Sequence, residues 1–331
     1  MGSLLEVENL CVDYITENGY VRAVDSVSFV IEEGKSLGLA GESGCGKSTI
    51  AYSLMRLHRP PALITNGKIK MDGKDILSLS EKELQKFRWK KISMVFQSAM
   101  NCLNPVVTLE KQFFELYKTH GITKNKKESR KMAEELLKIV GIPPERLKDY
   151  PHQLSGGMRQ RAVIAMALAL KPRLLILDEP TTALDTVVQR DILQKIYELK
   201  EQFNFSILFI THDISLMMEF CDTVAIMYAG KLVEQAPSMK ILKNPHHPYA
   251  YGLKNSFPSL QGEIKYMEGI PGIPLDLNCI PKGCRFQDRC FKATKICFEE
   301  EPGRSSRDGG FFYCHNPLEL VKEIWYGSTR N

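Results

Sequence analysis

The chain has 331 residues, 44% of them hydrophobic and 25% charged, and a formal net charge of +5. This length predicts about two domains, and the composition is that of a globular protein able to bury a core. The mild positive charge argues against a nucleic-acid-binding surface, and no apolar run approaches the ~18 residues that a spanning helix needs. The first residues, MGSLLEVENL, lack the pattern of a secretory signal, so we expect a cytosolic protein.

Strand patterns and helix patterns alternate along most of the chain. Residues 1–40 alternate apolar and polar side chains between turns, which indicates β-strands. Short apolar runs at 92–96, 173–178 and 206–211 are typical of strands buried on both faces. Helical patterns between them begin at residues 48, 126, 159 and 189. This order predicts an α/β fold around a mostly parallel sheet.

The pattern also predicts an insertion and a boundary. Residues from about 98 to 165 are rich in helix and loop, and they form a helical insertion between two sheet strands. Residues 223–235 resemble a hairpin that turns at Ala229 and Gly230. Beyond residue 235 prolines recur and periodicity fades, so we expect one domain over 1–235 and a loop-rich, cysteine-containing extension over 236–331.

The stretch GESGCGKST (41–49) has the spacing of a phosphate-binding loop between a predicted strand and a predicted helix. Its glycines let backbone N–H groups turn toward phosphates, Lys47 reaches the β- and γ-phosphates, and the Ser48 hydroxyl binds Mg²⁺. The alternative is a glycine turn with a surface lysine. The ATP-binding residues predicted in this loop are Gly41, Ser43, Gly44, Cys45, Gly46, Lys47, Ser48 and Thr49.

The stretch LLILDEP (174–180) is an apolar strand that ends in two carboxylates. Asp178 is placed to hold Mg²⁺ directly or through water, and Glu179 to polarise an attacking water. The alternative is an acidic pair that faces solvent at a strand end. The phosphate-binding loop in the same chain favours the catalytic interpretation.

The stretch QLSGGMRQR (153–161) places Ser155, Gly156 and Gly157 at the start of a predicted helix, which makes a second anion-binding site. One chain has no obvious use for two such sites on a single γ-phosphate, so we expect a composite site completed by another subunit. These residues resemble the signature of the ABC-type ATPases, which is close to LSGGQ. This chain differs at the fifth position, where Met158 stands, but keeps the phosphate-facing residues.

The resemblance covers residues 4–235 and implies further roles. Gln97 resembles the Q-loop glutamine that senses Mg²⁺ and water, Asp185 in TALD the D-loop aspartate at the dimer seam, and His212 the switch histidine that contacts the γ-phosphate. Tyr14 is the expected adenine-stacking residue, with Tyr20 as the weaker choice. The implied fold is the P-loop NTPase cassette of the ABC family, with a RecA-like core, an antiparallel β subdomain and a helical subdomain. Two cassettes would pair head to tail and hold ATP between them.

The sequence of the extension indicates which branch of the ABC family this chain resembles. Residues 244–258, NPHHPYAYGLKNSFP, and the P-x-G-C-x-F-x-x-R-C run at 281–290 resemble the tail of ATPase subunits of oligopeptide and dipeptide importers or of the related nickel importers. The implied partners are a second, different ABC ATPase subunit, two membrane permease subunits and, indirectly, a peptide-binding protein, with this chain at the cytoplasmic face of the membrane and no nucleic acid. A soluble ABC ATPase that acts on nucleic acid or the ribosome is the alternative.

Four cysteines of the extension, Cys284, Cys290, Cys297 and Cys314, have the spacing C-x5-C-x6-C-x16-C. Four soft thiolates suit either tetrahedral zinc or a [4Fe–4S] cluster. The C-x2–4-C pairs usual for structural zinc are missing, and the resemblance favours the cluster in a structural role. Disulfides or free thiols are the remaining alternative, and Cys279 is expected to be a spectator.

Overall fold

A computed structural model describes residues 2–17, 19–97, 102–181, 185–256 and 269–319 of the chain. By its internal contacts the chain divides into two compact units. We call residues 1–2, 32–35 and 78–208 the helical unit, and residues 3–31, 36–77 and 209–331 the strand unit. Among the described residues no helix is long and apolar enough to cross a membrane.

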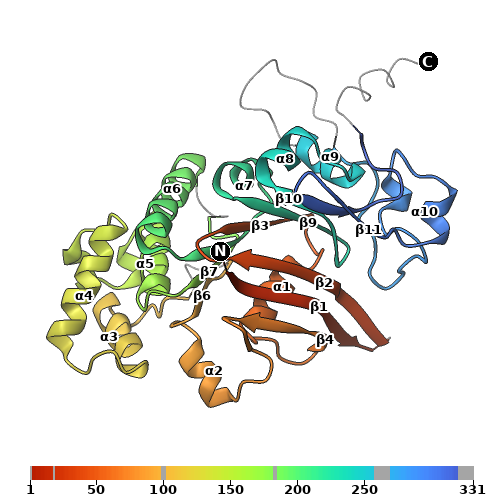
Figure 1. Cartoon of the computed structure of the whole chain (residues 1–331). Coiled ribbons are helices and arrows are strands. Elements are labelled where there is room, and N and C mark those ends of the chain that lie inside the picture. The colour runs from red at the N-terminus through yellow and green to blue at the C-terminus, as the bar shows by residue number, and fades with distance from the viewer. Residues whose placement is uncertain (1, 18, 98–101, 182–184, 257–268, 320–331) are drawn as a thin grey trace. The chain divides into compact units, whose positions relative to one another are not determined.

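The first sheet of the strand unit has four strands in the order β2-β1-β4-β5. β1 and β4 are antiparallel, and Leu5 and Val7 lie opposite Met71 and Ile69. All four of these side chains are at most 2% exposed, which explains the alternating pattern of the sequence. Figure 1 shows these strands in red and orange. Their bounds are β1 (Ser3–Thr16), β2 (Gly19–Glu32), β4 (Ala62–Met71) and β5 (Lys74–Asp75).

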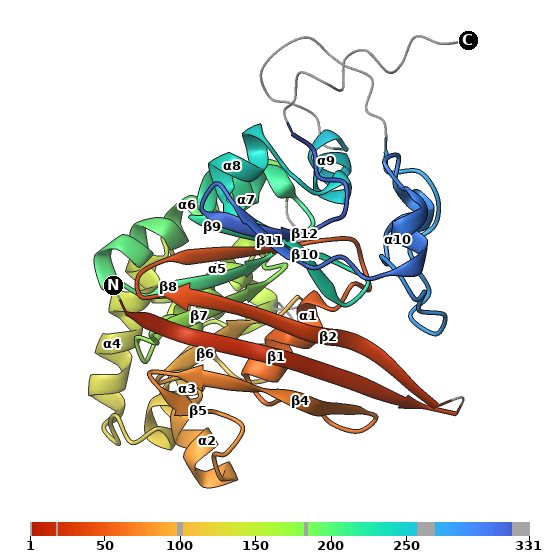
Figure 2. The same cartoon turned by 45° about the vertical axis from the view of Figure 1, so that its right-hand side comes forward.

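A second set of strands in this unit has the order β11-β12-β10-β9-β3. β3 is parallel to β9, and β9 and β10 form the predicted hairpin, whose turn residues Ala229 and Gly230 both have positive φ. β12 extends the hairpin, with Phe312 opposite Glu234 (Figure 2). The bounds are β3 (Ser36–Ala40), β9 (Thr223–Tyr228), β10 (Lys231–Pro237), β11 (Arg304–Arg307) and β12 (Gly310–Tyr313).

Three helices of the strand unit pack on these strands: α7 on β3, α8 on β9 and β10, and α9 on β10. Gly38 of β3 allows a close approach of α7, because a Cβ there would lie 3.1 Å from the sulfur atoms of Met217 and Cys221. Tyr249 of α9 is fully buried. The helices are α1 (Lys47–Leu54), α7 (Ile214–Phe220), α8 (Ser238–Lys243), α9 (Pro248–Asn255) and α10 (Lys295–Glu299), with one 3-10 turn, η4 (Gln287–Arg289).

The helical unit contains the parallel strands β6 (Ile92–Val95) and β7 (Leu174–Asp178), next to which β8 (Ser206–Ile210) begins. Its helices α3 and α4 pack through Phe113, Tyr117, Ala133 and Leu137, all fully buried. The helices are α2 (Glu81–Phe87), α3 (Leu109–Thr119), α4 (Lys126–Ile139), α5 (Gly156–Leu168) and α6 (Thr186–Phe203), with 3-10 turns η2 (Pro144–Lys148) and η3 (Pro151–Gln153).

The predicted boundary near residue 235 is not a boundary between these two units. Residues 209–331 belong to one unit, and the extension returns to the edge of β10 through β12. Gly310 permits this pairing, because a Cβ there would lie 2.2 Å from the carbonyl oxygen of Gln235. The division into 1–235 and 236–331, and the insertion over about 98–165, stay predictions, and residues 98–101 of that insertion lie outside the described residues.

Candidate functional site

The glycine loop connects the buried strand β3 with the N-terminus of α1 in the strand unit. Gly41 has φ 149° and Gly46 φ 104°, a region that side chains avoid. A Cβ at Gly41 would lie 2.3 Å from the carbonyl oxygen of Met227, and one at Gly46 would lie 2.5 Å from that of Ala23. Both glycines are therefore required by conformation and by close backbone contacts.

Lys47 is the first residue of α1 and is only 7% exposed. Its Nζ donates to the carbonyl oxygens of Gly41 at 2.7 Å and Glu42 at 2.8 Å, so the ammonium is held inside the curve of the loop. Ser48 follows in the first turn of α1, whose free N–H groups and dipole favour an anion. The loop thus combines the buried Lys47 ammonium with backbone N–H donors, and both kinds of group bind phosphate.

Two other side chains border this loop. Cys45 is buried, which raises the pKa of its thiol and keeps it neutral. The Tyr14 hydroxyl lies 3.5 Å from the Thr49 hydroxyl, so the tyrosine predicted to stack on adenine borders the start of α1. Tyr20, the weaker choice, is 73% exposed.

The carboxylate pair lies at the end of β7 in the helical unit. Asp178 is the last residue of the strand and is 2% exposed. Glu179 follows with φ 45°, a left-handed conformation that is uncommon for a residue with a side chain. Gln97 Nε2 donates to Glu179 Oε2 at 2.7 Å, so the structure brings together two residues that the sequence predicted separately.

The signature residues begin α5 in the same unit. Ser155 is its N-cap, and its hydroxyl accepts the N–H of Met158 at 3.3 Å. Gly156 and Gly157 form the first turn, and a Cβ at Gly157 would lie 3.2 Å from Val188. This close packing of α5 against α6 explains a small residue there.

Asp185 and His212 lie where loops enter helices. Asp185 caps α6, and its carboxylate accepts the N–H of Val188 at 2.9 Å. Residues 182–184 of the predicted D-loop lie outside the described residues. His212 is exposed in the strand unit, between β8 and α7, and the next residue, Asp213, caps α7.

The four predicted cysteine ligands are neighbours. The pKa of Cys314 is raised to about 12, mainly by burial and in smaller part by the charges of Cys290, Cys284 and Cys297, so these three thiols lie within electrostatic reach of Cys314. In the described part of the chain, however, no group of three or more His, Cys, Asp or Glu is arranged to hold a metal ion. The structure therefore supports the clustering of the thiols but not a metal centre. Cys279 is exposed.

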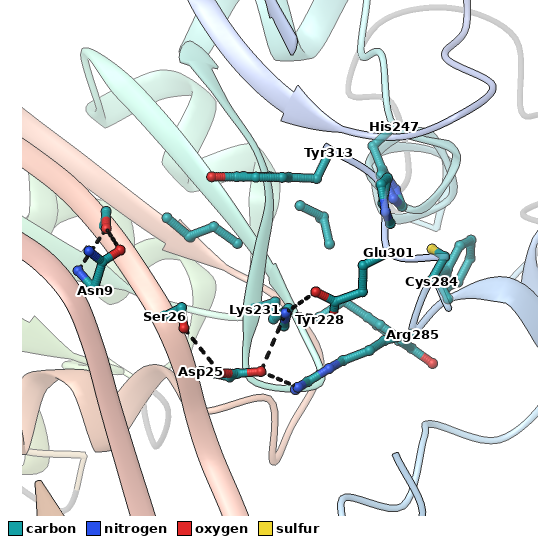
Figure 3. Close-up of a pocket in the computed structure, with 15 residues that line it drawn as sticks. Asn9, Asp25, Ser26, Tyr228, Lys231, His247, Cys284, Arg285, Glu301 and Tyr313 are labelled. Carbon is teal, nitrogen blue, oxygen red and sulfur yellow. Dashed lines mark hydrogen bonds and ion pairs between the residues drawn. The ribbon is translucent and has the colours of Figure 1, made fainter. Parts of the chain in front are cut away.

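An ion-pair network ties the cysteine region to the rest of the strand unit (Figure 3). Arg285, next to Cys284, donates to Asp25 and to the carbonyl oxygen of Ala229 in the β9–β10 turn. Lys231 bridges Asp25, at 3.4 Å, and Glu301, at 2.7 Å. These groups line a cavity of about 250 Å³.

The sequence pattern predicted no role for Tyr249, although this residue lies in the family-like stretch 244–258. The Tyr249 hydroxyl accepts the backbone N–H of Glu42 at 2.9 Å, so α9 braces the glycine loop. The contact joins residues 207 positions apart, and no local pattern in the sequence could have revealed it.

Comparison with known proteins identifies the family. Residues 24–182 match the family model described as ABC transporter, and residues 233–297 match the one described as the C-terminal region of oligopeptide/dipeptide transporters. The oligopeptide transport ATP-binding protein OppD of Bacillus subtilis is 47% identical over 305 residues, which cover 90% of this chain and 84% of that protein. The chain belongs to the oligopeptide/dipeptide branch of the ABC transporter ATP-binding proteins. The predicted family is confirmed.

Other relatives and solved structures agree with this membership. The dipeptide transport ATP-binding protein DppD of Lactococcus lactis is 46% identical, over 90% of this chain and 86% of that protein. A dimeric ATP-binding cassette in a post-hydrolysis state, bound to ADP and Pi, has 30% identity and a TM-score of 0.64, over 71% of this chain and 98% of that one. CbiO1 of Clostridium perfringens has a TM-score of 0.62 and 29% identity, over 73% of this chain and 91% of that one. The predicted ABC cassette fold is confirmed, and this ABC protein is an ATPase by family.

Proposed function

We propose that this ABC ATPase powers the uptake of dipeptides or oligopeptides through a membrane transporter. The observation that carries the proposal is the match of residues 233–297 to the C-terminal region of oligopeptide/dipeptide transporters, because a cassette alone is common to many ABC proteins. Relatives named for peptide transport, which align over 90% or more of the chain, support it. The chain acts at the cytoplasmic face of the membrane, bound to two permease subunits that receive peptide from a binding protein.

ATP binding in this proposal uses the glycine loop of the strand unit. Lys47 exchanges the carbonyl oxygens of Gly41 and Glu42 for the β- and γ-phosphates, and the N-terminus of α1 adds backbone donors. The Ser48 hydroxyl and the Asp178 carboxylate would each supply an oxygen ligand for Mg²⁺, a cation that prefers such ligands. The Tyr14 ring stacks on adenine beside Thr49.

Hydrolysis depends on the carboxylate of Glu179. As a general base it takes a proton from the water that attacks the γ-phosphate. The 2.7 Å hydrogen bond from Gln97 orients that carboxylate, which supports the proposed role of the Q-loop in hydrolysis. His212 contacts the γ-phosphate from the loop before α7. None of these roles needs a residue outside the ordered motifs of the cassette.

The second half of each ATP site comes from a partner ATPase, most simply a different subunit in a heterodimer. Ser155 and the glycines after it open α5 with free N–H groups, and such a helix start binds an anion. The γ-phosphate joins the two subunits, and its loss on hydrolysis removes that bond. The N-cap geometry of Ser155 supports this role.

The four cysteines would hold a [4Fe–4S] cluster with a structural role, and zinc is the alternative. The proximity of the thiols and the family resemblance support this proposal, although the described residues are not arranged as a metal site, and the cluster would fasten a segment with little regular structure. The chain purified without oxygen is expected to be brown with a broad absorption band near ~400 nm, and Cys290→Ser to lose it. A colourless protein with one bound zinc, or with no metal, would contradict the cluster.

A transport assay tests the proposed function. Cells that lack this chain are supplied with the wild type or with Lys47→Ala, and uptake of a labelled dipeptide and a labelled pentapeptide is compared with uptake of Ni²⁺. We expect the wild type, and not the variant, to restore uptake of peptide. Restored Ni²⁺ uptake with unchanged peptide uptake would favour the nickel importers, and DNA-stimulated ATP hydrolysis would favour a nucleic-acid ATPase.

A further inference from the structure

Arg289 reaches the nucleotide loop from the cysteine region. It lies in the turn η4, directly before Cys290, and its two terminal nitrogens donate to the two carboxylate oxygens of Glu42 at 2.7 and 2.9 Å. Two parallel charge-assisted bonds of this kind give both strength and a fixed orientation. The pair is shielded, because the side chains of Arg289 and Glu42 are 5% and 24% exposed.

The guanidinium of Arg289 is itself held on several sides. Its Nε donates to the carbonyl oxygen of Pro271 at 2.8 Å. Its central carbon lies 5.7 Å from the ring centre of Tyr228 and 5.9 Å from that of Phe286, within the range of cation–π attraction. Because the Arg289 guanidinium is fixed by these contacts, it can in turn fix the carboxylate of Glu42.

Glu42 connects this arginine with Lys47. Its carboxylate is held by Arg289, its N–H donates to the Tyr249 hydroxyl at 2.9 Å, and its carbonyl oxygen accepts the Lys47 ammonium at 2.8 Å. The backbone that positions the Lys47 ammonium is thus fixed from the side chain and from the amide. Loss of the ion pair would loosen the Glu42 peptide group, whose carbonyl oxygen accepts the Lys47 ammonium.

A second contact links the cysteine region with the glycine loop. Phe286, two residues after Cys284, is 2% exposed and packs on the rings of Tyr228 at 5.1 Å and Tyr249 at 5.2 Å. Tyr249 in turn binds the Glu42 backbone. The segment between Cys284 and Cys290 therefore braces the loop by an ion pair and by an aromatic cluster.

We propose that Arg289 is a positioning residue for ATP binding, which holds Glu42 so that the glycine loop presents Lys47 to the phosphates. The extension then controls nucleotide affinity within its own chain, and any disturbance of the cysteine region that shifts η4 weakens ATP binding. This inference rests on the proposed function, since it takes the glycine loop as the ATP site.

The test compares affinity with stability in the full-length chain. The Kd for a fluorescent ATP analogue with Mg²⁺ and the melting temperature are measured for wild type, Arg289→Gln, Glu42→Gln and the double variant. We expect each single substitution to raise Kd about 10-fold, the size of one lost charge-assisted pair. The double variant adds no more than about 2-fold, because both single changes remove one interaction.

A matched control separates the loop from general anchoring of the extension. Glu301→Gln removes another ion pair between the extension and the rest of the strand unit, the one with Lys231, and that ion pair involves no residue of the loop. Its Kd should equal that of the wild type. Arg289→Lys keeps the charge but loses the second hydrogen bond, so its Kd should lie between those of wild type and Arg289→Gln.

Two results would overturn the inference. One is a lower melting temperature with unchanged Kd in Arg289→Gln, which assigns the arginine to stability alone. The other is a double variant whose fold-increase in Kd equals the product of the fold-increases in the two single variants. If Arg289→Gln does not fold, Arg289→Lys and Glu42→Gln decide by the same comparison of Kd with melting temperature. A wild type that binds no ATP, or a Lys47→Ala variant that binds it equally well, would instead refute the proposed function.

Discussion

Glu179, the proposed general base, has an uncommon backbone conformation. Its backbone has φ 45° at the end of a fully buried strand, a conformation that costs about 1 kcal/mol or more for a residue with a side chain and persists where function needs it. The turn this creates allows the carboxylate to receive the Gln97 amide at 2.7 Å. In the proposed mechanism this position and this hydrogen bond orient the carboxylate for the role of base.

Glu179→Gln is predicted to separate ATP binding from hydrolysis. The amide keeps the shape and can still accept a hydrogen bond, so the Kd for MgATP should stay within about 3-fold of wild type. Loss of the base should slow phosphate release at least about 100-fold. Binding is measured on the purified chain and turnover on the chain together with its partner ATPase, with Glu198→Gln on the surface of α6 as the control. Wild-type turnover by the Glu179 variant would remove this residue from the mechanism.

At the scale of elements, α9 connects the extension to the glycine loop. The helix begins at His247, whose Nδ1 accepts the N–H of Tyr249 at 3.0 Å and so caps it. The carboxylate of Glu234 accepts the backbone N–H groups of His246 and His247 at 2.8 and 2.7 Å. This buried start of the helix places Tyr249 against Glu42.

His247 predicts a pH dependence of stability. Burial lowers its pKa to about 3, whereas the unfolded residue has a pKa of ~6.5. Below pH ~6.5 the unfolded chain gains a proton that the folded chain refuses, so the free energy of unfolding falls as pH falls toward 3. Between pH 7.5 and 5.5 the wild type should lose about 1.4 kcal/mol more than His247→Asn, which keeps a capping acceptor but does not titrate.

Urea denaturation at the two pH values measures this difference. Burial raises the pKa of Glu234, which acts in the opposite direction, but Glu234 is present in both proteins and cancels in the comparison. Equal losses in wild type and variant would show that His247 is protonated in the folded chain, contrary to its burial.

The sequence predicted the elements well where local physics decides them. The apolar runs became β6, β7 and β8, and the hairpin turns at Ala229 and Gly230 as predicted, with both residues at positive φ. The pairing of β12 with β10 and the Arg289–Glu42 contact could not be predicted. They join residues far apart in the chain, and such pairs leave no periodic pattern.

At the scale of the whole molecule, family membership explains why the chain carries two kinds of anion site. Lys47 at the glycine loop and Ser155 at the start of α5 each offer an electropositive helix start. In the proposed cycle two ATP molecules bind between this chain and a partner ATPase. One contacts the glycine loop of this chain and the signature residues of the partner, and the other contacts the signature residues of this chain and the glycine loop of the partner. Association would then depend on the γ-phosphate.

Sedimentation of Glu179→Gln together with the partner ATPase tests this claim most directly. We predict a heterodimer with MgATP, separate subunits with MgADP, and weakened MgATP-dependent association when Ser155→Glu is added, because its carboxylate repels the γ-phosphate. The same association with ATP, with ADP and with Ser155→Glu would contradict a nucleotide held between the two subunits.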